Sequence, residues 1–114
     1  MIKPEISWKD FEKLDIRTGT IIAAHDFPEA RNPSYKLEID FGNLGIKKSS
    51  AQITVLYKKE DLVGVQILAV VNFPKKQIAN FISECLILGV YGENKKEVTL
   101  VSATKATANG LSLG

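Results

Sequence analysis

The stretch Tyr35-Lys36-Leu37-Glu38-Ile39-Asp40-Phe41 is the clearest indicator of fold class in this chain of 114 residues. Its apolar side chains alternate with charged ones, and the pattern stops at Gly42. A period of two residues puts one set of side chains on each face of a strand, so the stretch predicts a half-buried β-strand.

The segments on either side of this strand are also typical of β-structure. Residues 16–24 are rich in Ile and Thr and predict a strand, in which Gly19 marks a bend or bulge. Residues 28–33 begin and end with proline and predict a loop, whereas 42–45 predict a turn and 46–53 a second short strand.

Apolar runs at residues 65–71, 85–90 and 98–101 predict further strands, and a small helix is expected near 57–63 with Gly64 at its end. Five or more short strands with two small helices favour a closed or partly closed barrel, because a barrel leaves few unpaired edges. The expected fold is therefore all-β with small helices, in a single domain over residues 1–114.

A short helix is predicted at the N-terminus, where Ser7 can cap the first turn and Asp10 follows three residues later. Trp8 and Phe11 lie three residues apart and so share one face of this helix. We expect this apolar stripe to pack, either on its own domain or across a dimer.

Composition excludes several classes of protein. Apolar residues make up 45% and charged residues 25%, which is typical of a globular chain. One cysteine and one histidine, Cys85 and His25, provide neither an internal disulfide nor a four-ligand zinc site, and no nucleotide-binding or nucleophile motif is present. We expect no enzyme activity, metal or cofactor. Without a signal-peptide core or an apolar run long enough to span a bilayer, the chain is expected to be soluble and cytoplasmic.

The net charge of +2 is unevenly distributed along the chain. Residues 43–83 contain six lysines in three adjacent pairs, at 47–48, 58–59 and 75–76, against only two acidic residues. Each pair alone is typical of a solvated turn. If folding gathers the pairs on one side, they form a basic face that attracts phosphate backbones.

The connection from Asn72 to Glu84 is the most informative segment for function. Lys75 and Lys76 can contact phosphates there, while Asn72, Gln77 and Ser83 can hydrogen-bond sugars or base edges. Phe73 and Phe81 either offer stacking surfaces or belong to the core.

Five segments together resemble the OB-fold tRNA-binding domain that is appended to some methionyl- and phenylalanyl-tRNA synthetases and to the endothelial-monocyte-activating polypeptide. The similar segments, in chain order, are Leu14-Asp15-Ile16-Arg17-Thr18-Gly19-Thr20-Ile21, Phe27–Arg31, Lys48–Ile53, Glu60–Gly64 and Val70–Pro74. The form of residues 14–19 and 45–53 and the short length are most similar to the CsaA family of export-related, chaperone-like proteins.

The resemblance implies a five-stranded OB-fold barrel that forms a homodimer through extensions at residues 1–13 and about 102–114. It also implies binding of tRNA or another structured RNA. The expected nucleic-acid-binding residues are Arg17, Lys47, Lys48, Ser49, Asn72, Lys75, Lys76, Gln77 and Ser83, and the expected dimer residues are Trp8 and Phe11.

The stretch Ala79-Asn80-Phe81-Ile82-Ser83 departs from the wider family, which tends to have basic and glycine residues there. Asn80 can still adopt the left-handed backbone that a glycine would supply, because Asn tolerates this region better than most residues. Because Ala79 and Ile82 are apolar, more of the electrostatic attraction falls on Lys75 and Lys76.

A second hypothesis is a polypeptide-binding chaperone that assists export and holds unfolded or presecretory chains. It would use exposed apolar surface, such as a dimer groove lined by Trp8 and Phe11, and its binding would depend little on salt.

Overall fold

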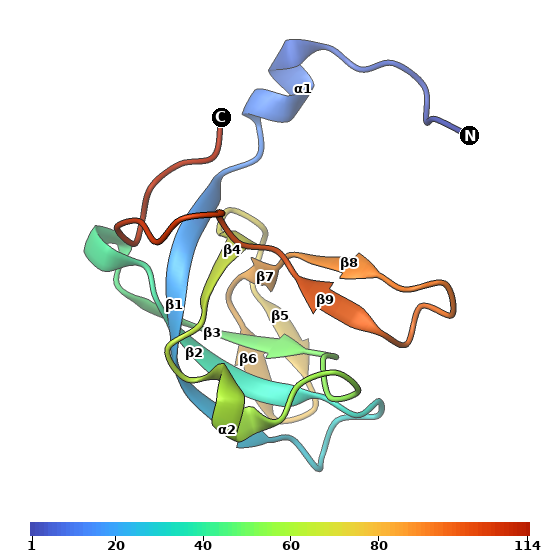
Figure 1. Ribbon diagram of the computed structural model, residues 1–114, viewed down its shortest axis with the longest axis vertical. Helices are drawn as coiled ribbons and strands as arrows, with labels where there is room; N and C mark the ends of the chain where they lie inside the picture. Colours follow the sequence, from blue (N-terminus) through green and yellow to red (C-terminus); the bar gives the residue numbers. More distant parts are fainter.

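The computed structural model describes residues 1–114 and is built around a nearly closed, five-stranded antiparallel barrel (Figure 1). Its strands follow the order β3-β2-β1-β4-β7. The Glu84 amide donates to the Lys48 carbonyl at 2.8 Å, which ties the last strand region back to β3. The predicted fold class is confirmed. The barrel strands are β1 (Ile16–Asp26), β2 (Tyr35–Asp40), β3 (Ile46–Ala51), β4 (Gln66–Val70) and β7 (Leu86–Ile87).

The alternation of residues 35–41 predicts the faces of β2 correctly. Leu37, Ile39 and Phe41 are almost fully buried, while the charged residues between them remain partly exposed. The core also takes in Ile21 from β1 and Ile67 from β4. Full burial of one such side chain stabilises the fold by about 1.5–3 kcal/mol, so this alternation is the main local determinant of the barrel.

The irregularity of β1 lies at Ile22 and not at Gly19, where it was predicted. The register passes from Ile21 opposite Ile39 to Ala23 opposite Glu38, which leaves Ile22 as the extra residue. Gly19 is needed for a different reason. A Cβ there would lie 2.6 Å from Ile39 Cγ2 and 2.8 Å from the Phe41 ring, so close packing excludes a side chain.

Between β4 and β7 the chain forms a hairpin of β5 (Lys76–Ile78) and β6 (Phe81–Ser83), which the sequence pattern did not reveal. Strands of three residues are too short to show a period. Ala79, with φ of 51°, has the left-handed backbone, so the expectation for Asn80 is wrong. Positive φ at the first central residue is the pattern of a type II′ hairpin turn, and Asn80 at the second position keeps a negative φ.

The apolar run at 85–90 splits at Leu88 into β7 and β8 (Gly89–Tyr91), and β8 pairs with β9 (Val98–Leu100). This second hairpin extends away from the barrel (Figure 1). The remaining elements are a 3-10 turn (Gly42–Leu44) and the helix α2 (Lys59–Leu62), both close to the predicted positions.

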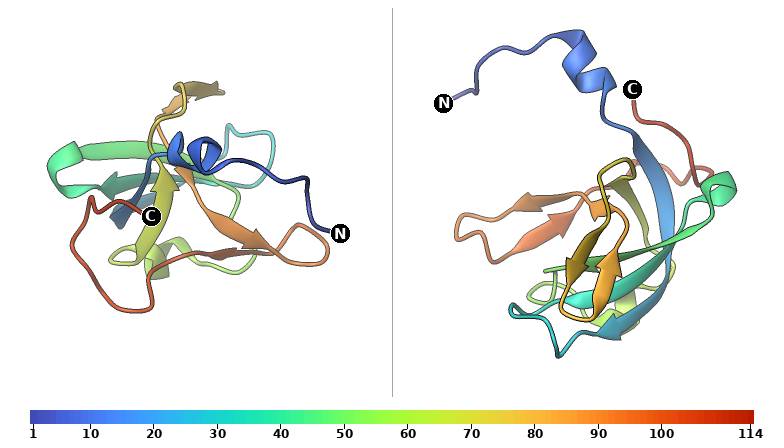
Figure 2. Two further views of the ribbon diagram at one scale, coloured as in Figure 1. Left: turned by 90° about the horizontal axis from the view of Figure 1, so that it is seen from above. Right: turned by 180° about the vertical axis from the view of Figure 1, so that it is seen from behind.

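The N-terminal segment stands away from the barrel (Figures 1 and 2). Helix α1 (Trp8–Glu12) has the predicted capping box between Ser7 and Asp10 but buries none of its residues. Trp8 is 85% exposed, so packing of this side chain on its own domain is not what the structure shows. No helix of the structure combines the length and hydrophobicity needed to cross a membrane.

The C-terminal segment lies along the first residues of β1, where β2 does not pair. Thr18 donates its amide to the Leu111 carbonyl at 3.0 Å, and Gly110 and Leu113 donate to Thr18 and Ile16 at 2.7 and 2.9 Å. We call residues 108–113 the C-terminal strap. These residues of the expected dimerisation extension are thus bonded to their own barrel.

Candidate nucleic-acid interface

The outer face of β2 and β3 carries two lysines. Cross-strand pairing places Lys36 opposite Ser50 and Glu38 opposite Lys48, on the side opposite buried Leu37. His25 of β1 lies opposite Lys36. A hollow of about 270 Å³ lies here, and its lining includes His25, Lys36, Glu38, Lys48 and Phe81. Neither Lys36 nor His25 was among the predicted site residues, although the alternation of 35–41 had already placed Lys36 on the outer face.

Glu84 lies between the backbone of Lys48 and the side chain of Lys75. One carboxylate oxygen accepts from the Lys48 amide at 2.9 Å, and the other lies 3.8 Å from Lys75 Nζ. Lys75 and Lys76 are exposed at the start of β5, on the hairpin that lies beside β3 (Figure 2). Lys75 is 71% exposed while Glu84 is only 24% exposed, so the ammonium group remains available to a ligand. We call Lys36, Lys48, Lys75 and Lys76 the basic face.

The third lysine pair lies elsewhere. Lys59 on α2 forms an ion pair with Asp26 at 2.7 Å, and the hydrogen bond with this carboxylate raises the pKa of Lys59 above its ordinary value. Lys47 is half-buried on the Ser49 side of β3, where its charge acts on Cys85. The basic face therefore includes Lys48 but not Lys47, and in the third pair Lys59 is occupied by Asp26.

Both predicted serines lie inside the protein. Ser49 is fully buried and donates its hydroxyl to the Cys85 carbonyl at 2.9 Å. Ser83 is 8% exposed and accepts from the Ser50 amide at 3.4 Å. Both side chains link β3 to the Ser83–Cys85 segment, so they hold the strands that carry Lys48 and Lys75.

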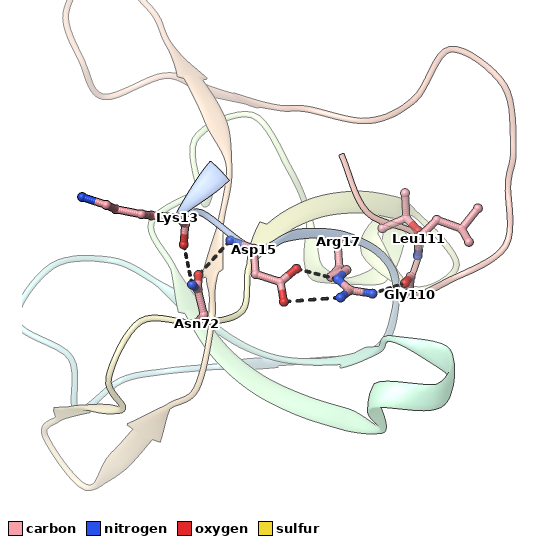
Figure 3. Close-up of polar contacts among 7 residues, drawn as sticks. Lys13, Asp15, Arg17, Asn72, Gly110 and Leu111 are labelled. Carbon is pink, nitrogen blue, oxygen red and sulfur yellow. Dashed lines mark hydrogen bonds and ion pairs between the residues drawn. The ribbon is translucent and has the colours of Figure 1, made fainter. Parts of the chain in front are cut away.

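Arg17 and Asn72 take part in a chain of internal hydrogen bonds (Figure 3). Arg17 pairs with Asp15 at 2.5 Å and donates to the Gly110 carbonyl at 2.9 Å. The hydrogen bond with Asp15 raises the pKa of Arg17 above its ordinary value. Asn72 accepts from the Asp15 amide at 2.9 Å and donates to the Lys13 carbonyl at 2.7 Å. These residues connect the N-terminal segment, the strap and the loop after β4.

Gln77 and Phe73 are exposed on the connection between β4 and β6. The Gln77 amide donates to the Ala79 carbonyl at 3.1 Å within the hairpin turn. Phe73 is 48% exposed, whereas Phe81 is half-buried against Phe27, with ring centroids 5.5 Å apart. The two phenylalanines left open by the sequence therefore differ: one has a free ring and the other has an edge contact.

Comparison with known proteins assigns the chain to a family. Residues 16–112 match the sequence profile described as "Putative tRNA binding domain", and the chain belongs to this family. It is 33% identical to a methionine–tRNA ligase of Chlorobium chlorochromatii over 111 residues. That match covers 97% of this chain but only 15% of the ligase.

Two solved structures resemble this chain over nearly its whole length. Chaperone CsaA of Bacillus anthracis is 49% identical, with a TM-score of 0.93 over 97% of this chain and all of that one. CsaA chaperone protein of Picrophilus torridus is also 49% identical, with a TM-score of 0.89 over 96% of this chain and all of that one. The predicted resemblance is confirmed.

Proposed function

We propose that this chain is a non-catalytic tRNA-binding module of the cytoplasm that holds RNA on the basic face. The observation that carries the proposal is the position of Glu84, whose partly buried carboxylate accepts from the Lys48 backbone amide and lies 3.8 Å from Lys75 Nζ. This contact brings the segment that begins β5 close to β3, although the two are far apart in the sequence. Family membership supports tRNA as the ligand. Ammonium groups engage phosphates with little regard to base sequence, so shape and charge dominate recognition.

In this proposal four of the predicted residues do not contact the RNA directly: Ser49, Ser83, Arg17 and Asn72. Their polar groups are bonded inside the chain and hold β3, the β5–β6 hairpin and the strap in place. Lys48, Lys75, Lys76 and Gln77 provide the exposed groups. Lys47 contributes positive potential from its half-buried position.

Binding of tRNA over a salt series tests the proposal. If a dimer engages roughly four to six phosphates, log affinity falls against log salt with a slope of about −3 to −5. The double change Lys75→Gln with Lys76→Gln should flatten the slope by about 1–2. Lys95→Gln with Lys96→Gln is the matched control, because it removes the same charge from exposed adjacent lysines outside the basic face. Equal effects of both doubles, or binding insensitive to salt, would contradict the proposal.

We also propose a homodimer formed through the N-terminal arm, residues 1–13. Ile2, Ile6 and Trp8 of the arm are more than 70% exposed, and this apolar surface has no partner within the chain. A hollow of about 420 Å³ lies between the arm and the C-terminus, lined in part by Phe11, Leu14 and Leu113. Docking of the arm on a second copy would remove this surface from water.

Polypeptide binding is the second candidate function, favoured by the same exposed arm and by the likeness to two chaperones. In this candidate the arm or its hollow holds an unfolded or presecretory segment. Adding an unfolded peptide to the tRNA titration at low and high salt separates the two functions. Peptide held on the arm persists at high salt and does not displace tRNA. If the peptide binds no better than to an ordinary folded control protein, this candidate fails.

A further inference from the structure

The hollow on the outer face of the barrel combines positive charge with an aromatic wall. Its floor carries two cross-strand rows, one of His25 and Lys36 and the other of Glu38 and Lys48. Phe81 from β6 forms the wall. Two ammonium groups and one carboxylate leave this small volume with a positive charge, which favours an anion.

The aromatic wall is held in place by contacts from two other segments. Phe81 meets Phe27 edge to face, with an angle of 61° between the rings, and Phe27 is almost fully buried. Lys36 Nζ lies 5.5 Å from the centre of the Phe27 ring. The Lys36 side chain therefore extends from the floor of the hollow to the aromatic pair, and its contact with the Phe27 ring limits its freedom.

The hairpin above the hollow is tied to the loop between β1 and β2. Asn80 donates to the Glu29 carboxylate at 3.4 Å, which joins the β5–β6 turn to this loop. Together with the Glu84 contact to Lys48, this bond fixes the hairpin at both ends relative to the floor. The hollow thus lies between the outer face of β1–β3 and the β5–β6 hairpin, which is held in place over it.

We propose that this hollow is a subsite for one unpaired nucleotide of the bound RNA. Its base stacks on Phe81, and its phosphate contacts Lys36 and Lys48. His25 supplies a hydrogen-bonding ring edge for the base or the sugar. The inference rests on the proposed function but adds recognition of a splayed base to recognition of charge. Aromatic side chains beside a cationic groove are the usual means of holding single-stranded nucleic acid.

The size and chemistry of the hollow favour a nucleotide over a phosphorylated peptide. A peptide phosphate would use the two lysines but leave the ring of Phe81 without a flat partner. At about 270 Å³ the hollow is close to the lower limit of ligand pockets, which suits one nucleotide and excludes a duplex.

Two RNA probes of equal charge test this subsite. One is a hexamer of adenosine, and the other is an abasic hexamer with the same ribose-phosphate backbone. We expect the adenosine hexamer to bind about 10-fold more tightly, because only it can stack. Phe81→Leu should remove this difference, and Phe73→Leu is the matched control because Phe73 is an exposed phenylalanine of the same connection that does not line the hollow. Lys36→Gln should weaken both hexamers equally.

A measurement on the wild-type protein tests the subsite even if Phe81→Leu disrupts the fold. Adenosine monophosphate should shift the NMR signals of the His25 and Phe81 rings, and inorganic phosphate should shift His25 without comparable effect on Phe81. Equal affinity for the two hexamers, or equal effects of the Phe73 and Phe81 changes, would overturn the subsite. Loss of the salt dependence of tRNA binding would overturn the proposed function instead.

Discussion

At the scale of single residues, Cys85 and Ser49 place polar groups inside an otherwise apolar core. Ser49 donates to the Cys85 carbonyl, and Cys85 Sγ lies 3.8 Å from the Lys48 carbonyl oxygen. Burial raises the pKa of the Cys85 thiol from 9.0 to about 11, although the hydrogen bond with Ser49 and the charge of Lys47 oppose the shift. The thiol is therefore neutral at physiological pH and is a poor nucleophile.

This shift makes stability depend on pH in alkaline solution. The unfolded chain releases the thiol proton above pH 9.0, whereas the folded chain keeps it until about pH 11. Folding stability is therefore lost as pH rises through this interval, by about 1.4 kcal/mol per unit. In urea unfolding, the advantage of the native chain over Cys85→Ala should shrink by about 2 kcal/mol between pH 8 and pH 10.5. Comparison with Cys85→Ala cancels the titration of tyrosines and lysines, and an advantage independent of pH would contradict the burial of the thiol.

At the scale of elements, the C-terminal strap depends on a close approach to the end of β2. Gly110 has φ of 83°, and a Cβ at this position would collide with the Phe41 carbonyl oxygen. Gly45 has a similar φ of 85°, but a Cβ there would have open space around it. Substitution at Gly45 therefore tests backbone strain alone, whereas substitution at Gly110 tests strain and steric clash together.

Alanine substitutions at these glycines should differ in cost. Gly45→Ala should lower the free energy of unfolding by about 1 kcal/mol, because only the left-handed backbone is strained. Gly110→Ala should cost a further 1–3 kcal/mol or so, because the strap must move away from Phe41. Urea unfolding measures both, and faster amide exchange at Leu111 and Leu113 would show that the strap is released first. Equal costs would mean that the strap is not held by this approach.

At the scale of the whole molecule, the N-terminal arm should control assembly. In sedimentation, we expect the full chain to have twice the mass of the 12.6 kDa monomer. Deletion of residues 1–13 should give a monomer whose barrel still unfolds cooperatively, because α1 has no buried residue. The emission of Trp8, the only tryptophan, should shift to the red when a dimer is diluted. A full-length chain that stays monomeric at every concentration would contradict the proposed dimer.

Most of the barrel can be predicted from the chain because its strands have local signals. Near neighbours in the sequence produce the alternation of 35–41 and the apolar run before Val71. The same holds for the capping pair Ser7 and Asp10 of helix α1. The hairpin β5–β6 and the bulge at Ile22 have no such signal. The bulge is set by the register between β1 and β2, and the two strands of the hairpin have only three residues each, too few to show a period.

The candidate site was only partly predictable for the same reason. Residue type suggested that Asn72 and Ser49 were binding groups, but type does not tell whether a polar atom faces solvent or a buried partner. The structure uses Asn72 to hold the arm and Ser49 to hold β3. His25 and Lys36 line the same hollow as Phe81, which lies more than forty residues later in the chain. No local sequence pattern predicts that they lie close together.

The sequence by itself determined an all-β domain with a lysine-rich central segment. Both features depend only on composition and on short periods of charged and apolar residues along the chain. Tertiary structure alone decided which lysines stand together. Closure of the barrel brings the backbone of Lys48 and the ammonium group of Lys75 to the carboxylate of Glu84, while Lys59 on α2 pairs with Asp26. The physical reason is that ionic and aromatic contacts depend on distance in space, which strand pairing sets only after the whole sheet has formed.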